Sequence, residues 1–228
     1  MPLNIFKWTA TLCSLLACTA VITPASANAA DIAGGLKAST LGAGVEGTLG
    51  LTSDLNLRTG VYVFSYGAST HKSGLPIAYN LNLRSLPVLL DWFLLDDGSG
   101  FRFSSGVIIN NNKYNANAEP ADSYDIGGVV YMADQVGTLN GEVKFGTFAP
   151  YVGIGWGNPF TAESHLSFSF DLGIAFQGKP DVAMAATGSV ATDPAFQENL
   201  RQEEKNIKNE IDAFKYYPVI SAGITYRF

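Results

Sequence analysis

The last ten residues of the chain, Val219–Phe228, read VISAGITYRF and decide the fold class. Apolar side chains stand at every second position, and the residues between them are mostly small or polar. Alternation of this kind is typical of a β-strand whose two faces meet different surroundings. The apolar positions are Ile220, Ala222, Ile224, Tyr226 and Phe228.

The same alternation runs through most of the chain before this strand. It is clearest in residues 166–176, where an apolar side chain recurs at every second position from Leu166 to Phe176. In residues 79–93 the alternation changes phase near Arg84 and Ser85, and Pro87 follows. Because proline cannot donate to a ladder, these features together predict a β-bulge at this point.

The composition of the two faces indicates which solvent surrounds the sheet. The polar faces hold glycine, serine, asparagine and isolated charges, whereas a water-soluble sandwich would expose many Lys and Glu residues there. In lipid every backbone group must be paired, so a spanning sheet has to close on itself. The sequence therefore predicts an all-β fold, an antiparallel transmembrane β-barrel with apolar side chains outside and polar ones inside.

The terminal pattern, carried by Ile224, Tyr226 and Phe228, resembles the assembly signal of Gram-negative outer-membrane β-barrels. Longer segments resemble a group of small outer-membrane proteins without an assigned role. The resemblance implies a barrel in the cell outer membrane, in contact with lipid and lipopolysaccharide and recognised by the barrel-assembly machinery. It implies no activity. The longer segments are Gly42–Ser65, Leu83–Trp92, Ala149–Asn158 and Phe168–Gly178.

Nine segments of the chain have the strand pattern, whereas single-chain bacterial barrels have an even number of strands. Omitting residues 181–189 leaves eight strands, which is the expected number, with ten as the alternative. The segments are residues 36–50, 55–66, 78–93, 101–114, 137–147, 150–157, 166–176, 181–189 and 216–228.

The first 29 residues have the pattern of a cleaved secretory signal peptide. Lys7 precedes an apolar stretch from Trp8 to Ile22, and small residues follow at Ala25–Ala27. Residues 30–228 would then form the mature barrel. A lipoprotein processing site at Cys18 is an alternative, whereas cleavage after the small residues removes both Cys13 and Cys18.

Composition excludes several other classes of protein. Of the 228 residues, 14 are basic and 20 acidic, so 15% are charged, and 12% are aromatic. Disordered chains have few aromatic residues, and nucleic-acid binders carry a basic surface. No nucleic-acid partner is therefore expected.

Residues 193–215 interrupt the strand pattern and predict an amphipathic helix in the loop before the last strand. Asp193 is a suitable N-cap and Pro194 suits the first helical position. Glu204 and Lys208 are spaced to form an i,i+4 pair. The helix could pack on the barrel rim, lie on the membrane surface or bind a partner. Residues 115–137 predict a small hairpin around Gly127 and Gly128.

Strand alternation directs seven charged side chains into the lumen. Isolated charges in a narrow barrel are costly, so a paired network that fills the interior is expected, with a polar conduit as the alternative. The change of phase leaves Arg84 and Asp91 unassigned. The seven residues are Glu46, Arg58, Arg102, Glu142, Lys144, Asp171 and Arg227.

An enzymatic function has one candidate site. His165, Ser167 and Glu163 are similar to the arrangement in outer-membrane lipid A deacylases, in which histidine activates serine. That pair faces lipid, however, whereas Ser167 should face the lumen. No cofactor or metal site is expected, because two distant histidines cannot form a zinc site. The expected role is structural or interactive and non-enzymatic, with a narrow porin-like channel as the first alternative and a lipid-modifying enzyme as the second.

Overall fold

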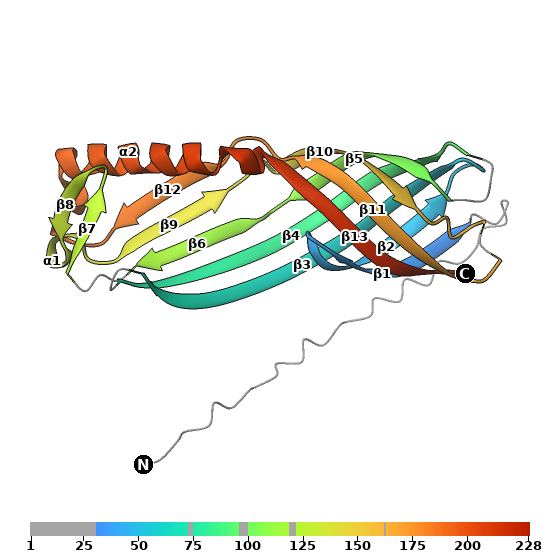
Figure 1. Cartoon of the computed structure of the whole chain (residues 1–228), viewed down its shortest axis with the longest axis horizontal. Helices are drawn as coiled ribbons and strands as arrows, with labels where there is room; N and C mark the ends of the chain where they lie inside the picture. Colours follow the sequence, from blue (N-terminus) through green and yellow to red (C-terminus); the bar gives the residue numbers. More distant parts are fainter. Residues whose placement is uncertain (1–30, 73–74, 96–99, 119–121, 162) are drawn as a thin grey trace, which may run out of the picture.

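The computed structural model describes residues 31–72, 75–95, 100–118, 122–161 and 163–228. The predicted signal peptide, residues 1–29, lies outside the described residues. The molecule is elongated, with a closed ring of strands at one end and an open sheet covered by a helix at the other (Figure 1). No helix in the described part of the chain is long and apolar enough to cross a membrane.

Eight antiparallel strands close the ring, which confirms the predicted all-β barrel and its strand number. Neighbours in the ring run in the order β1, β2, β3, β4, β5, β10, β11, β13, and β13 pairs again with β1. We call the end where β1 begins and β13 ends the terminal end. The strands are β1 (Ile32–Ser39), β2 (Gly42–Gly50), β3 (Leu55–Lys72), β4 (Leu75–Phe93), β5 (Arg102–Asn110), β10 (Phe148–Trp156), β11 (Leu166–Phe176) and β13 (Tyr216–Arg227).

Five strands continue beyond the ring, away from the terminal end, and form a sheet that we call the extension. β3 and β4 run on without interruption, while β5, β10 and β11 are continued by three shorter strands. The order in the extension is β3, β4, β6, β9, β12. The shorter strands are β6 (Lys113–Ala118), β9 (Leu139–Lys144) and β12 (Asp181–Ala186).

The grouping of segments into strands differs from the prediction in three places, and β3 continues to Lys72, beyond its predicted end at residue 66. The segment 36–50 is two strands, β1 and β2, joined by a two-residue turn at Thr40 and Leu41. Conversely, 137–147 and 150–157 form one interrupted strand, and so do 166–176 and 181–189. Glycine and proline between two apolar segments mark a bend as readily as a turn, which is why the pattern alone misplaced these boundaries.

The predicted bulge near Arg84 and Ser85 is wrong. β3 and β4 pair in a single register from Leu55 opposite Trp92 to Lys72 opposite Leu75. Pairing is interrupted only around Pro87, which has no N–H to donate. The alternation changes phase in the sequence because apolar Leu83 and Leu89 are buried on the inner face of β4, where polar residues were expected.

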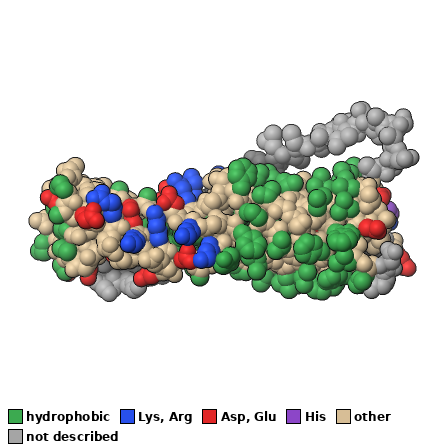
Figure 2. Space-filling model, turned by 90° about the horizontal axis from the view of Figure 1, so that it is seen from above, with side chains coloured by type: hydrophobic (Ala, Val, Ile, Leu, Met, Phe, Trp, Pro, Cys, Tyr) green, Lys and Arg blue, Asp and Glu red, His purple; other side chains and the backbone are tan. Residues whose placement is uncertain are grey.

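The outer surface of the ring is a continuous apolar belt. Figure 2 shows apolar side chains gathered over this half of the molecule, and charged ones over the extension. Aromatic side chains mark both edges of the belt, as in transmembrane barrels. At the terminal end these include Trp92, Trp156 and Tyr226, and at the other edge Phe148, Phe176 and Tyr216, all of them exposed.

The predicted helix is present as α2 (Pro194–Glu210), between the short 3-10 helices η1 (Ser189–Thr192) and η2 (Asp212–Lys215). Asp193 caps it, because its Oδ1 accepts a 2.9 Å hydrogen bond from the backbone N–H of Phe196. Phe196 and Leu200 are buried. The helix lies along β12, so it packs on the extension of the barrel wall (Figure 1).

The prediction of an ion pair between Glu204 and Lys208 is wrong, because both side chains contact β12 instead. Glu204 accepts a hydrogen bond from the N–H of Met184 at 2.8 Å, and Lys208 pairs with Asp181 at 3.1 Å. These contacts attach the helix to the edge of the extension.

The predicted hairpin is confirmed at the far end of the extension. β7 (Ser123–Ile126) and β8 (Val129–Met132) pair across Gly127 and Gly128, whose φ angles are 62° and 84°. Two consecutive positive φ angles are typical of a type I′ turn, which favours glycine. A short helix, α1 (Ala133–Val136), follows, and Val136 packs with Phe196 in a small core beneath α2.

Candidate functional site in the barrel lumen

Six charged side chains meet inside the ring, and each comes from a different strand. Their residues are at most 9% exposed to solvent. Three are cations and three are carboxylates, so the group, which we call the charge cluster, is formally neutral. Its members are Lys37, Glu46, Arg58, Asp91, Arg102 and Asp171.

Asp171 lies at the centre of the charge cluster and accepts from four side chains. Lys37 Nζ lies 2.6 Å from its Oδ2, Arg58 Nη1 3.1 Å and Ser221 Oγ 3.0 Å. Arg102 Nη2 also donates to Asp171 Oδ1. These contacts join β11 to β1, β3, β13 and β5, so a single carboxylate ties together four other strands of the ring.

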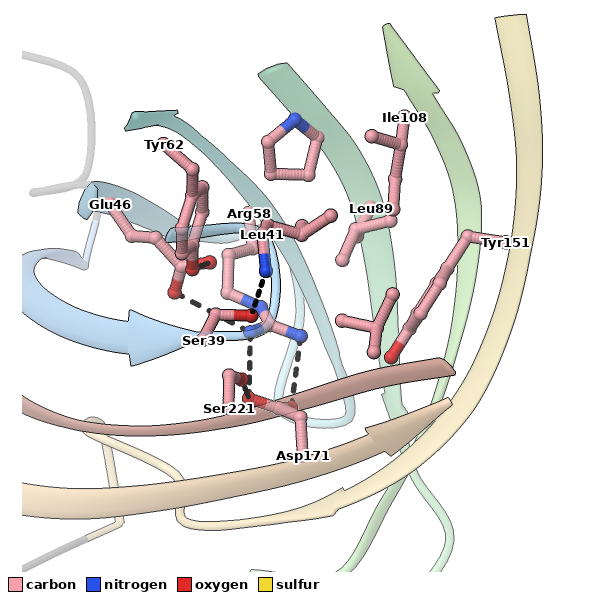
Figure 3. A pocket seen from close by; sticks show the side chains of 12 residues that line it. Ser39, Leu41, Glu46, Arg58, Tyr62, Leu89, Ile108, Tyr151, Asp171 and Ser221 are labelled. Carbon is pink, nitrogen blue, oxygen red and sulfur yellow. Dashed lines mark hydrogen bonds and ion pairs between the residues drawn. The ribbon is translucent and has the colours of Figure 1, made fainter. Parts of the chain in front are cut away.

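Arg58 connects the remaining carboxylates. It forms a two-point contact with Asp91, through Nε at 2.8 Å and Nη2 at 3.1 Å. Its Nη1 lies 3.4 Å from Glu46, which also accepts a 2.6 Å hydrogen bond from the hydroxyl of Tyr62. Figure 3 shows Arg58 between Glu46 and Asp171. Because buried charges are costly unless they are paired, this mutual pairing explains how six charges can be buried in one lumen.

An apolar layer fills the lumen on the side of the charge cluster away from the terminal end. Tyr62, Leu89, Ile108 and Tyr151 converge there next to Arg58 (Figure 3). The complete apolar layer consists of Leu41, Tyr62, Leu89, Ile108, Ala149, Tyr151, Ala175 and Val219.

Glycines on the inner wall make room for these large side chains. The Tyr151 ring lies against Gly153 and Gly173, and a methyl group added at Gly173 would collide with the Tyr151 hydroxyl. At Gly155 an added methyl group would lie 2.6 Å from Asp171 Oδ1. The glycine-rich inner face is therefore the space in which the apolar layer and the charge cluster pack.

Small cavities of about 20 Å³ each lie inside the ring between the described residues, and two of them border the charge cluster. A volume of this size holds about one water molecule. Arg58 and Glu46 line both cavities, so these side chains stand between them. In this structure the charge cluster and the apolar layer close the lumen.

The structure brings together four of the seven side chains expected in the lumen: Glu46, Arg58, Arg102 and Asp171. Glu142 and Lys144 lie on β9, outside the ring, and pair with each other with side chains 36% and 45% exposed. Arg227 is half-buried at the terminal end, where its Nη1 donates to the carbonyl of Phe160 at 2.9 Å. Glu142 and Lys144 were expected in the lumen because residues 137–147 have the pattern of barrel wall, whereas they form the extension.

Sequence reasoning missed Lys37 and left Asp91 unassigned. A continuous strand over residues 36–50 would direct Lys37 to the lipid face. Because of the turn at Thr40 and Leu41, the odd-numbered residues of β1 and the even-numbered residues of β2 point inward, so Lys37 faces the lumen. A signal was available, because a lysine facing mid-bilayer lipid costs about 2–4 kcal/mol and is therefore rare. Asp91 lies in the strand where Leu83 and Leu89 obscured the inward face.

In the candidate enzyme site Ser167 and His165 contact backbone carbonyls, and Glu163 is exposed. Ser167 is buried and its Oγ donates to the carbonyl of Thr225 at 3.4 Å. His165 Nδ1 lies 3.1 Å from the carbonyl of Arg227, and its ring stacks on Tyr226. Tyr226 is exposed on the outer face of the ring, as are Ile224 and Phe228 at the end of the chain.

Comparisons with known proteins find similarity in structure only. No protein-family model matches the sequence, and no curated protein matches it. The crystal structure of Acinetobacter baumannii CarO2 is similar with a TM-score of 0.58 and 17% identity, over 87% of this chain and 98% of that chain. The chain shares the β-barrel fold of CarO2.

The crystal structure of Acinetobacter baumannii CarO is similar to the same degree, with a TM-score of 0.56 and 18% identity over 86% of this chain and 97% of that chain. Coverage of this size takes in much of the extension as well as the ring. At such low identity the likeness to CarO and CarO2 concerns the fold alone.

Proposed function

We propose that this protein is an integral outer-membrane β-barrel with a closed lumen, non-enzymatic, which holds the extension at the cell surface as an interaction module. The observation that carries the proposal is the filling of the lumen by the charge cluster and the apolar layer. A lumen closed in this way leaves the extension, with its covering helix, as the part of the molecule free to meet other molecules.

Three features support the location. The apolar belt, with aromatic side chains at both edges, suits the hydrocarbon region of a bilayer and the lipid and lipopolysaccharide around it. The predicted signal peptide would direct export. Ile224, Tyr226 and Phe228 present the pattern that the barrel-assembly machinery would recognise. In this arrangement the terminal end faces the periplasm and the extension faces outward.

A narrow channel is the alternative, and the geometry favours it less. A solute moving along the axis would have to separate Arg58 from Asp91 and Asp171 and then displace the Tyr62 and Tyr151 side chains. Breaking buried ion pairs costs several kcal/mol. Passage would therefore require a large rearrangement of the lumen.

Cysteine labelling in whole cells tests the location and the topology. Both cysteines of the chain lie within its first 18 residues, so a single new cysteine reports one position in the mature protein. Gln202 is exposed on α2 and Ser53 is exposed in the turn between β2 and β3 at the terminal end. A membrane-impermeant maleimide should label Gln202→Cys in intact cells and Ser53→Cys only after permeabilisation. The opposite result would contradict the proposed orientation, and labelling of neither variant in intact cells would contradict surface display.

Conductance across planar bilayers separates a closed barrel from a channel. The purified protein should give no reproducible unitary openings, while a large porin in the same bilayer serves as the positive control. Regular ohmic steps from the wild-type protein would refute the closed lumen.

A further inference from the structure

Three cations lie together on the outer face of the extension, just beyond the apolar belt. Leu86 belongs to the belt, and Arg84 is the next residue of β4 on the same face and is exposed. Lys113 of β6 is directly opposite Asn82 of β4, and Lys144 of β9 is directly opposite Lys113. Strand alternation therefore places Arg84, Lys113 and Lys144 on one face of the sheet. We call these three residues the cation group.

The spacing within the cation group is unfavourable unless an anion is present. Lys113 and Lys144 stand opposite each other on neighbouring strands, a position in which like charges destabilise a sheet. Arg84 lies diagonally from Lys113, and such neighbours are about 7–8 Å apart, within reach of long side chains. A single anionic group between these side chains would offset their repulsion.

The carboxylates on this face of the extension already have partners. Glu142 forms an ion pair with Lys144, and Asp181 forms one with a lysine of α2 at 3.1 Å. Neither Arg84 nor Lys113 has an ion-pair partner among the described residues. Two cations are therefore available to a negatively charged group from outside the protein. Guanidinium and ammonium groups both form strong, charge-assisted hydrogen bonds with phosphate.

Amide side chains continue the same face toward the tip of the extension. Asn115, Asn117 and Asn140 have no side-chain hydrogen bond with any described residue, so their donors and acceptors are available. Together with Glu142 they border a hollow of about 340 Å³, and small side chains such as Ala183 form its floor. An amide group donates and accepts hydrogen bonds, as a sugar hydroxyl does, and the small floor residues leave room for a sugar ring.

We propose that this face binds a lipopolysaccharide molecule of the outer leaflet, with a phosphate on the cation group and sugars on the amide side chains. A lipid whose acyl chains cover the apolar belt has its phosphates at the level of Arg84 and its sugars farther from the membrane. The sequence of belt, cations and amides along this face matches the sequence of acyl chain, phosphate and sugar in that lipid. The inference rests on the proposed function, in which the extension faces outward.

Native mass spectrometry of the mature protein in an uncharged detergent tests the site, with rough-type lipopolysaccharide as the probe. The control lipid is the same material after removal of its phosphate with hydrofluoric acid. The control variant is Lys205→Gln, which removes an exposed cation from α2. The wild type and Lys205→Gln should bind one molecule of the phosphorylated lipid equally. The double variant Arg84→Gln with Lys113→Gln should bind it roughly four- to twenty-fivefold more weakly, which is the effect of two partly exposed ion pairs.

Equal binding of the phosphorylated lipid by the wild type and the double variant would overturn the proposal. An equal loss with the dephosphorylated lipid would overturn it as well, because the cations would then not be recognising phosphate. Heat-modifiable migration on a gel shows that each variant is folded. Labelling of cells reports the orientation and does not depend on lipid binding in detergent, so failure of this site and failure of the proposed function give different results.

Glu142→Gln tests the same site with a change of opposite sign. The substitution frees Lys144 and removes a carboxylate from the edge of the site. The phosphorylated lipid should therefore bind roughly two- to fivefold more tightly than it does to the wild type. Unchanged or weaker binding would overturn the assignment of Lys144 to the phosphate.

The sugar contact is tested with phosphatidylglycerol, which has a phosphate but no sugar. Ala183→Phe fills the hollow from an exposed position on β12. It should weaken lipopolysaccharide binding by roughly two- to tenfold, the contribution of about one hydrogen bond, and leave phosphatidylglycerol binding unchanged. Equal lipopolysaccharide binding by the wild type and Ala183→Phe, or equal affinity of the wild type for the two lipids, would overturn the assignment of the sugars to this face.

Discussion

Replacing Asp171 by asparagine removes one negative charge from the centre of the charge cluster with little change in shape. Lys37, Arg58 and Arg102 would then face only Glu46 and Asp91, so the lumen would carry one unbalanced positive charge. Asp171 accepts from four side chains, and asparagine offers a single carbonyl oxygen in place of the carboxylate.

Removal of one partner from a buried ion pair costs about 3–5 kcal/mol, because the other charge is left buried without compensation. Asp171 and its partners are almost fully buried, with side chains 2–5% exposed. The upper part of this range is therefore expected for Asp171→Asn.

The assay is urea unfolding of the protein in phospholipid vesicles, followed by the heat-modifiable shift on a gel. Glu142→Gln is the control, since it removes a carboxylate from an exposed ion pair on β9 and should cost about 0–1 kcal/mol. In the double variant Asp171→Asn with Lys37→Gln the cluster is neutral again. The two changes should therefore be less costly together than their sum, by about 0.5–3 kcal/mol.

A loss of stability in Asp171→Asn no greater than that in Glu142→Gln would refute the reasoning. Strict additivity in the double variant would refute it as well, because it would mean that Lys37 and Asp171 do not interact.

Three further predictions concern the packing of the lumen and of the helix. Gly173→Ala should lower the free energy of unfolding by about 1–3 kcal/mol, because its methyl group displaces Tyr151. Gly47→Ala, where no atom lies within 4 Å of the added group, should have little effect in the same unfolding assay. Phe196→Ala should release α2, at a cost of about 3–5 kcal/mol, so that limited proteolysis cuts the helix while the ring keeps its heat-modifiable shift. Asp193→Ala should weaken the same helix by about 1 kcal/mol through loss of the N-cap, with smaller but measurable acceleration of that cleavage.

The barrel itself could be predicted from the sequence, because strand alternation records which side chains face lipid. Ile220, Ile224 and Tyr226 are all exposed on the outer face, as the pattern indicates. The polar inner face was predicted less well, since Leu89 and Tyr151 also point inward. A two-letter pattern of apolar and polar residues cannot distinguish an apolar side chain that faces lipid from one that fills the lumen.

Most of the remaining differences between prediction and structure concern whether the odd-numbered or the even-numbered residues of a strand point inward. A two-residue turn at Thr40 and Leu41 reverses the inward positions, so Lys37 enters the charge cluster unpredicted. In the extension the inner face is apolar, because Tyr114 and Val143 lie against Ile207 of α2, so Glu142 and Lys144 lie on the outer face although the alternation gives them the pattern of lumen residues. The alternation does not show where along a strand the membrane ends. It also does not show a turn whose two residues are neither glycine nor proline.

The single register that joins β3 and β4 from the ring to the tip has a consequence for recognition. The part of β3 beyond the ring, Phe64–Lys72, measures about 30 Å along the strand at about 3.4 Å per residue. Because it is held by the same hydrogen-bond ladder as the barrel wall, it projects from the membrane as part of a rigid sheet rather than as a flexible loop. Its surface has a fixed height and angle relative to the ring, so the protein loses little conformational entropy when another molecule binds there. Orientation relative to the membrane is thereby built into the strands themselves.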